Sequence, residues 1–599
     1  MKARLFMLAL LLLVPVQFVA AQQAPGAEFE EYVNKAIKDW GVPGVAIAIV
    51  KDDHVVFAKG FGVRELNKPA PVDEHTLFAI GSSSKAFTAA SIAMLVDEGK
   101  LKWDDPVTKY LLGFQLFDPY ATRELTVSDL LTHRSGLTRG DLLWYASPYD
   151  RNEVVRRVRY LKPSWSLRSR FGYQNIMFLA AGQIIPSVTG KSWDDFVRER
   201  IFTPLGMKST STSIRALANS DDVASPHAKL EDKVQVVSWR NIDNIAPAGS
   251  INSNVEDMAQ WLRLQLGGGT YENKRLLSSG VMKEMHAPQT IIRIEGVNAI
   301  LYPDAHFLNY GMGWFLSDYR GRKLVEHGGA IDGMRAEVAM VPEEKLGVVV
   351  LTNLNGTILP HALMYKIVDF YLGAAPRDWC AEMLKATKGL EEQAKAAEKK
   401  ADAERVTGTS PSLPLEKYAG SFQSEMYGEL KIGLEDQKLV ARFGPNFTGD
   451  LEHWNYDTFR VKWRDPMEGK GFANFKLNSQ GKVETVNIEG LTEFTRTAAE
   501  PAAPVSAVPM SETDLKKFVG KYALAAPPLE VSIELINGSL KANVPGQPLY
   551  SLIPVAANRF RLEGAPAGFF AEFELGDGKP KSLTLVQGER GNVVLLAKS

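Results

Sequence analysis

The stretch GSSSKAF, residues 81–87, stands directly before the almost wholly apolar run TAASIAMLV, residues 88–96. Such a run predicts a helix that is buried on most of its faces. Ser82 and Lys85 are three residues apart, so they share one face at the start of this helix, where the two side chains can meet. Either the serines cap the helix beside a solvated lysine, or Ser82 is a nucleophile activated by an amine.

The surroundings of Ser82 favour the nucleophile. A desolvated amine prefers its neutral form, and a neutral amine can take a proton from a serine hydroxyl. The spacing alone is a weak signal, because Ser479 and Lys482 repeat it in the polar turn NSQGK. That second copy is expected to be exposed to solvent, whereas Ser82 follows the apolar run TLFAI and begins a buried helix.

Two further motifs contain residues that can take part in catalysis. A Y-x-N pattern occurs three times, but only Tyr173 and Asn175 join a polar loop, SLRSRFG, to an apolar run, IMFLAAG. A packed aromatic with a solvated hydroxyl is an equally good interpretation of Tyr173 alone. The third motif, HGG at 327–329, has glycines that let the backbone lie close to a ligand. By itself it is also compatible with a hairpin turn that carries an ordinary histidine.

The three motifs together, in this order, resemble those of the serine β-lactamase and penicillin-binding-protein superfamily. That group carries S-x-x-K, then Y-x-N or S-x-N, then K-T-G or H-x-G. The segments LVDEGKLKWDDPVTKYL, LTVSDLLTHRSGL, IFTPLGMKST, AGSINSNVEDMAQWL and NYGMGW resemble the class C β-lactamase-like branch. The sequence contains no S-D-N, so the class A branch fits poorly. The resemblance covers residues 27–375.

The resemblance implies a role for each reactive side chain. Ser82 is the expected nucleophile, and Lys85 is its base. Tyr173 is expected to move protons to and from the leaving group, and Asn175 to hold Lys85 and the substrate carbonyl. The product of the first step would be an acyl-serine, which water then hydrolyses.

The resemblance also implies a role for the backbone. The N–H groups of Ser82 and Ala330 would form an oxyanion hole, and His327, Gly328 and Gly329 would line the inner edge of the cleft. His327 departs from the lysine of true class C β-lactamases. An unperturbed histidine is mostly uncharged at neutral pH, so a weaker grip on a substrate carboxylate is expected. In this superfamily, H-x-G accompanies D-amino-acid peptidases, carboxypeptidases and esterases.

The hydrophobic pattern predicts an α+β catalytic domain over residues 22–380. GVAIAIV and HVVFAKGFGV alternate around the turn KDD, and AEVAMVPEEKLGVVVLTN forms a second alternating pair around PEEK. Helical patterns lie between these hairpins, so the first and last strands are expected to share one antiparallel sheet flanked by helices. Pro186 should kink or end the helix that contains IMFLAAGQIIPSVTG.

The C-terminal part predicts two antiparallel β-barrel domains, over 411–496 and 511–599. A charged helix and linker, 381–410, precede the first, and a Pro/Ala linker, 497–510, separates them. LEKYAGSF at 415–422 matches LKKFVGKY at 515–522, and further aromatic positions repeat about 100 residues apart, which indicates a duplicated unit. This order of domains resembles the D-aminopeptidase arrangement, in which barrels flank the cleft.

Composition and the N-terminus restrict the class of protein. Residues 1–21 carry basic, apolar and small-residue parts in the order of a signal peptide cut after Ala21, which predicts a secreted or periplasmic protein without a stable membrane anchor. The formal charge of −1 gives no indication of nucleic-acid binding. Cys380 is the only cysteine, so internal disulfides and multi-cysteine metal sites are excluded. Nine histidines form no H-E-x-x-H, and we expect no metal and no cofactor.

The sequence therefore predicts a secreted serine hydrolase that forms an acyl-enzyme on Ser82. The expected substrates are small peptides or amides, D-amino-acid-containing ones among them. An esterase or a weak β-lactamase with the same residues is the sibling alternative, and a catalytically inactive binding protein is the alternative from another class. An α/β-hydrolase is disfavoured, because G-x-S-x-G does not occur. The natural substrate and the oligomeric state do not follow from the sequence.

Overall fold

The computed structural model describes residues 24–497, 507–524, 528–563, 565, 569–577, 579–587 and 592–598. The predicted signal peptide and its cleavage site after Ala21 lie outside these residues. Within the described ranges, no helix combines the length and the apolar character that a membrane span requires.

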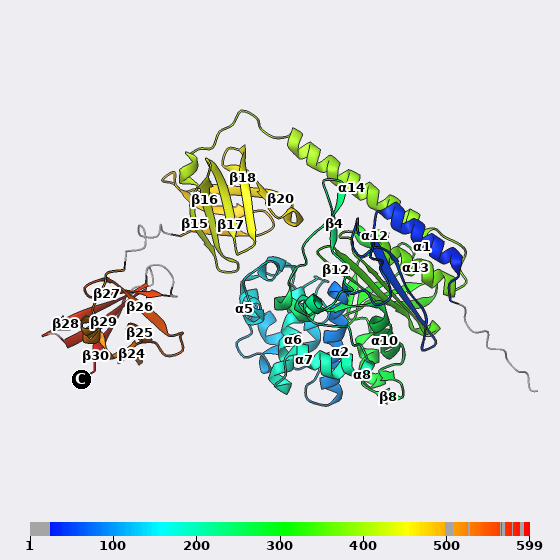
Figure 1. Ribbon diagram of the computed structural model, residues 1–599, viewed down its shortest axis with the longest axis horizontal. Helices are drawn as coiled ribbons and strands as arrows, with labels where there is room; N and C mark the ends of the chain where they lie inside the picture. Colours follow the sequence, from blue (N-terminus) through cyan, green and yellow to red (C-terminus); the bar gives the residue numbers. More distant parts are fainter. Residues whose placement is uncertain are drawn as a thin grey trace, which may run out of the picture. The chain divides into compact units, whose positions relative to one another are not determined.

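An eight-stranded antiparallel sheet organises the N-terminal part, in the order β2-β1-β14-β13-β12-β11-β10-β9 (Figure 1). Its central strands are β1 (Gly44–Lys51), β14 (Leu346–Thr352), β13 (Met334–Val341) and β12 (Arg322–Ile331). Around them lie β2 (His54–Gly62), β11 (Phe315–Tyr319), β10 (Leu308–Tyr310) and β9 (Thr290–Ile292). The β1–β2 and β13–β14 hairpins and the pairing of β1 with β14 confirm the predicted joining of the first and last strands.

Helices cover both faces of this sheet (Figure 1). One face packs on α1 (Ala27–Trp40), α13 (Leu359–Tyr371) and the start of α14 (Trp379–Ala403), around a core that includes Ile47 and Val348. A Cβ at Gly347 would meet Leu262 of α10 (Val255–Leu266), so α10 covers the other face. The α+β fold predicted from the hydrophobic pattern is therefore confirmed.

Two of the three motifs, S-x-x-K and Y-x-N, lie at the starts of two buried helices on the α10 side. A short 3₁₀ turn, η1 (Gly81–Ser83), leads into α2 (Ser84–Asp97), which is buried along nearly its whole length. Next to α2 runs α6 (Asn175–Thr189), and both contact the short helix α9 (Ala246–Gly249). The helix does not end at Pro186: it continues to Thr189 and ends at Gly190, whose φ of 73° is left-handed. Pro186 lies in the last turn, where it removes the one helical hydrogen bond that its own N–H would donate and only three helical residues follow it.

The strands of the C-terminal part close into two eight-stranded barrels, β15–β22 and β23–β30, as predicted. The first runs from β15 (Gly420–Ser424) to β22 (Glu493–Arg496), and the second from β23 (Gly520–Leu524) to β30 (Asn592–Ala597). Matching aromatic side chains contact one another inside each barrel: Tyr418, Phe459 and Phe475 in the first, and Phe518, Phe560 and Phe573 in the second. These triplets occupy the repeated sequence positions, which supports the predicted duplication.

Candidate active site

Ser82 and Lys85 meet at the start of α2. The 3₁₀ turn leaves Ser82 partly exposed, while Lys85, one turn on, is 0% exposed. Lys85 Nζ lies 3.0 Å from Ser82 Oγ and donates to the carbonyl oxygen of Ala248 at 2.8 Å. A lysine amine is thus fixed against the hydroxyl of a serine that a cavity can reach.

Burial determines the charge of this amine. Desolvation lowers the pKa of Lys85 well below its usual value, and the cationic Arg139 lowers it further, while Asp141 opposes both. The aromatic rings of Tyr173 and Phe178 flank Nζ, with centroids at 4.9 and 5.5 Å. Among the described residues no carboxylate is bonded to the amine, so its neutral form is favoured, and that form can accept the Ser82 proton.

Tyr173 lies beside both the serine and the lysine. A hydrogen bond connects its hydroxyl to Ser82, and burial raises the pKa of Tyr173 despite that bond and the nearby charge of Arg139. The ring packs on His133 with 4.2 Å between centroids, and the Arg139 guanidinium lies 4.9 Å from its centroid. Tyr173 is therefore a neutral hydroxyl at pH 7, positioned to pass a proton.

Asn175 lies at the start of α6 but has a different partner from the one expected. Its amide donates to Asp141 Oδ1 at 2.8 Å. The hydrogen-bond partners of the Lys85 amine among the described residues are Ser82 and Ala248. The resemblance implied a contact from Asn175 to Lys85; in this structure Asn175 instead orients Asp141, the carboxylate that acts on Lys85 through space.

His327 lies in β12 beside the reactive groups, but its ring is 1% exposed. Its Nδ1 lies 2.7 Å from the carbonyl oxygen of Gly328, which can only accept, so Nδ1 carries the proton. Nε2 then accepts from the Tyr310 hydroxyl at 2.9 Å. Burial, together with the charge of Lys85, lowers the pKa of His327 to about 3, so the ring is neutral at pH 7.

The backbone of β12 lies against the helix start. A Cβ added at Gly329 would lie 1.8 Å from the Ile80 carbonyl oxygen and 3.2 Å from Ser82 N, and one added at Gly81 would lie 2.5 Å from Ala330 N. Only glycine permits this approach. The N–H groups proposed for the oxyanion hole, those of Ser82 and Ala330, thus belong to two segments in direct contact.

The sequence did not single out His133, which forms part of the wall behind Tyr173. Its Nδ1 accepts from the Gln174 backbone at 3.0 Å, and its ring is 4.6 Å from that of Tyr310. Burial, followed by the charges of Lys85 and His327, lowers the pKa of His133 well below its usual value. Its only sequence signal is a polar residue after the apolar pair in LLTHRSGL, which does not distinguish it from a surface residue.

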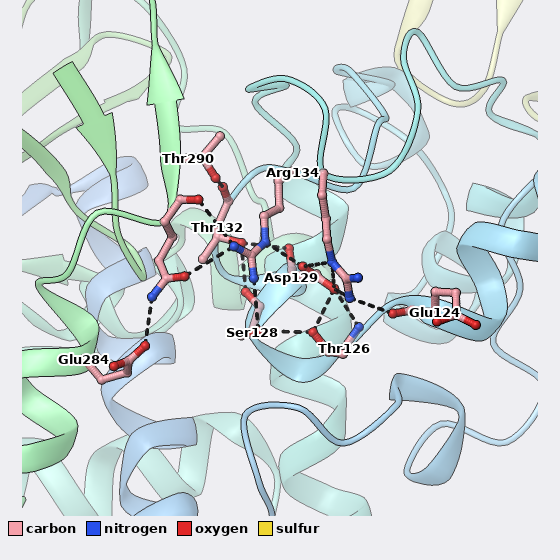
Figure 2. Close-up of polar contacts among 10 residues, drawn as sticks. Glu124, Thr126, Ser128, Asp129, Thr132, Arg134, Glu284 and Thr290 are labelled. Carbon is pink, nitrogen blue, oxygen red and sulfur yellow. Dashed lines mark hydrogen bonds and ion pairs between the residues drawn. The ribbon is translucent and has the colours of Figure 1, made fainter. Parts of the chain in front are cut away.

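An ion-pair network holds the segment around His133 (Figure 2). The fully buried Asp129 carboxylate accepts from Arg134 Nε at 2.6 Å and from Arg168 Nη2 at 2.7 Å. Thr290 Oγ1 donates to the Thr132 carbonyl oxygen at 2.7 Å, which joins the segment to β9. Burial would raise the pKa of Asp129, but the bond from Arg168 and the other contacts outweigh it and lower the pKa. The network fixes both neighbours of His133.

Ser82, Tyr173 and Asn175 line a cavity of about 720 Å³ together with His327 and Ala330, and the first barrel also contributes to it through Met467 and Glu468. Arg240 bridges to that barrel, because its guanidinium contacts Asp332 and Asp465, each at 2.8 Å. Burial raises the pKa of Glu468 to about 7. The cavity therefore has a polar wall away from the serine as well as the reactive groups beside it.

A serine hydroxyl bonded to a buried lysine and a neutral tyrosine, beside a sheet flanked by helices, defines a hydrolase of the active-site serine class. A family model described as Beta-lactamase matches residues 29–370, more than half of the chain. The chain belongs to this beta-lactamase family, as its motifs predicted. A domain family of unknown function, DUF3471, matches residues 404–502 and so spans the first barrel.

Individual relatives agree with this assignment. The chain is 31% identical over 439 residues to the unguisins hydrolase ungD' of Aspergillus campestris, covering 69% of this chain and 78% of the relative. Protein flp of Staphylococcus aureus is 25% identical over 338 residues, 56% of this chain and 64% of the relative. The octameric penicillin-binding protein homologue from Pyrococcus abyssi superposes with a TM-score of 0.53 at 23% identity, covering 78% and 99% of the two chains, and supports the fold alone.

Proposed function

We propose that this protein is an exported serine hydrolase that cleaves peptide and amide bonds, D-amino-acid-containing ones among them, through an acyl-enzyme on Ser82. The observation that carries the proposal is the 3.0 Å contact between Lys85 Nζ and Ser82 Oγ within apolar packing. The signal-peptide pattern of residues 1–21 supports export.

The first step transfers the Ser82 proton to the neutral Lys85 amine while Oγ attacks the substrate carbonyl carbon. The carbonyl oxygen becomes an oxyanion, which the backbone N–H groups of Ser82 and Ala330 stabilise. As the tetrahedral intermediate collapses, the C–N bond breaks, the leaving nitrogen takes a proton from the Tyr173 hydroxyl, and the protonated Lys85 amine returns a proton to that hydroxyl. Water then attacks the acyl-serine by the reverse proton path, which releases the acid and restores the hydroxyl.

Tyr173 favours amides over esters as the substrate class. An amide nitrogen cannot leave as an anion, so it requires a proton donor, and a neutral hydroxyl bonded to the nucleophile supplies one. The relative from Aspergillus campestris is named for the hydrolysis of unguisins, which supports a hydrolytic role without naming this protein's substrate. The cavity of about 720 Å³ has room for a short peptide.

Two experiments test the proposal. A turnover panel of D- and L-aminoacyl amides, D-Ala-D-Ala peptides, short esters and nitrocefin identifies the substrate class, and we expect amides to be hydrolysed. If only esters are hydrolysed, the protein is an esterase, and if only nitrocefin is hydrolysed, it is a β-lactamase.

The second experiment separates an enzyme from a binding protein. Fluorophosphonate should add once to the wild-type chain and to the Ser479→Ala variant, but not to Ser82→Ala, as measured by intact mass. Ser479 is the matched control, because it has the same spacing to a lysine in an exposed turn. Unchanged turnover in Ser82→Ala would refute the assignment, and binding without turnover of any substrate in the panel would favour the inactive binding protein.

A further inference from the structure

A second polar cluster lies on the face of β12 and β13 that points away from Ser82. Side chains alternate along a strand, so Glu326 and Gly328 face opposite to His327 and Gly329. A Cβ at Gly328 would lie 3.2 Å from Glu337 Oε2, whereas one at Gly329 would meet the Ile80 carbonyl oxygen beside Ser82. The cluster therefore belongs to the opposite face of the sheet from the nucleophile.

Four side chains from four elements form this cluster. Glu326 comes from β12, Glu337 from β13, His361 from α13, and Tyr302 follows α12 (Val297–Leu301). They are 2%, 5%, 5% and 4% exposed, respectively. Tyr302 donates a hydrogen bond to Glu326, and all four side chains line the cavity that also reaches Ser82. Solvent thus has access to a group of buried ligating atoms.

The contacts of His361 fix the roles of its two ring nitrogens. Nε2 lies 2.8 Å from the Leu301 carbonyl oxygen, which only accepts, so Nε2 carries the proton. Nδ1 of the neutral ring is then an acceptor, and it lies 3.1 Å from Glu337 Oε2. Two facing acceptors repel each other unless a positive species, a proton or a metal ion, lies between them.

The pKa values of the two glutamates also indicate that the cluster has too little positive charge to balance their carboxylates. Burial raises the pKa of Glu337 to about 7, and burial together with Glu337 raises the pKa of Glu326 well above its usual value. Glu337 Oε1 is buried and has no hydrogen-bond partner among the described residues. Buried polar atoms almost always have a partner, so this carboxylate oxygen leaves one coordination position in the cluster open to a water molecule or an ion.

We propose that Glu326, Glu337 and His361 form a binding site for a divalent transition metal, zinc in the first place. Their ligating atoms all lie within 4.8 Å of one another, and zinc accepts imidazole nitrogen with carboxylate oxygen at about 2.0–2.2 Å. The outer contacts are those of a metal site, because His361 donates to a backbone carbonyl and Tyr302 orients Glu326. The ion would join β12, β13 and α13, and acyl transfer at Ser82 does not use it.

Zinc alone is the probe for the experiment, which uses the full chain after chelation and dialysis. Titration calorimetry should show one strong Zn²⁺ site in the wild type, and thermal unfolding should shift upward with added Zn²⁺. Glu337→Gln and His361→Gln should weaken Zn²⁺ binding by roughly 100-fold or more, and Tyr302→Phe by roughly 10–100-fold. His306→Gln is the matched control, because His306 pairs with Asp318 on the surface, away from the cluster.

Two controls distinguish a variant that has lost only the zinc site from a variant that no longer folds. Glutamine has the shape of glutamate without its buried charge, so metal-free Glu337→Gln should fold at least as well as the wild type. Fluorophosphonate labelling at Ser82 reports on the fold, and it should proceed equally with and without Zn²⁺. The proposal is overturned if the wild type binds no stoichiometric Zn²⁺, or if Glu337→Gln binds it as tightly, in which case a shared proton satisfies the cluster.

Discussion

Tyr173→Phe is the substitution that most directly tests the chemistry, because it removes one hydroxyl and leaves the ring. The ring is held by packing against His133 at 4.2 Å between centroids and by Lys85 and Arg139, each 4.9 Å from its centroid. These contacts remain in the variant. The free energy of unfolding should therefore fall only by the loss of one hydrogen bond, about 0.5–1.5 kcal/mol.

The effect on catalysis should be much larger and should depend on the leaving group. A positioned proton donor is worth roughly 10²–10⁴ in rate, or about 3–5 kcal/mol of barrier at 1.36 kcal/mol for each factor of ten. An amide should lose kcat/KM by that factor, because its nitrogen leaves only when protonated. A p-nitrophenyl ester of the same acyl group should lose less than roughly tenfold, because nitrophenolate leaves as an anion.

The assay compares kcat/KM for an aminoacyl amide, followed by ammonia release, with that for the matching p-nitrophenyl ester. Tyr271→Phe is the control, because Tyr271 also belongs to a Y-x-N pattern but its hydroxyl donates to Gln260 at 3.0 Å, outside the lining of the cavity. Neither substrate should change in that variant. Equal losses on amide and ester in Tyr173→Phe, or no loss on the amide, would refute the role of the hydroxyl as proton donor.

Three further substitutions test charge and stability. Arg139→Gln should raise the pKa of Lys85 and move the acid limb of the kcat/KM–pH profile to higher pH, because the neutral amine is the base and a nearby cation that disfavours its protonation is lost. Asp141→Asn should move the same limb to lower pH, because the carboxylate favours the protonated amine. Asp129→Asn should lower the free energy of unfolding by about 3 kcal/mol in urea denaturation, since it breaks a buried ion pair, whereas Asp53→Asn, at an exposed pair, should cost less than about 1 kcal/mol.

The sequence predicted the parts of the site that depend on local periodicity. A buried helix fixes the meeting of Ser82 and Lys85 through its own geometry, so the spacing was enough. The partners of Asn175 and the position of His133 depend instead on segments from different parts of the chain that meet only in the folded domain. Asp141 lies 34 residues before Asn175, and no local pattern marks either as a partner of the other.

His327 lines the cavity, as the motif predicted, but its ring nitrogens have partners that the motif did not indicate. As a substitute for a cleft lysine, it was expected to face the substrate and to grip a carboxylate weakly. In the structure both ring nitrogens are already bonded, Nδ1 to the Gly328 carbonyl oxygen and Nε2 to the Tyr310 hydroxyl. A lysine at this position could not replace two opposed bonds, one donated and one accepted, and would place another amine beside Lys85 in a desolvated space. The histidine is therefore a neutral, fully bonded side chain in the wall of the cavity, and a lysine in its place should destabilise this part of β12.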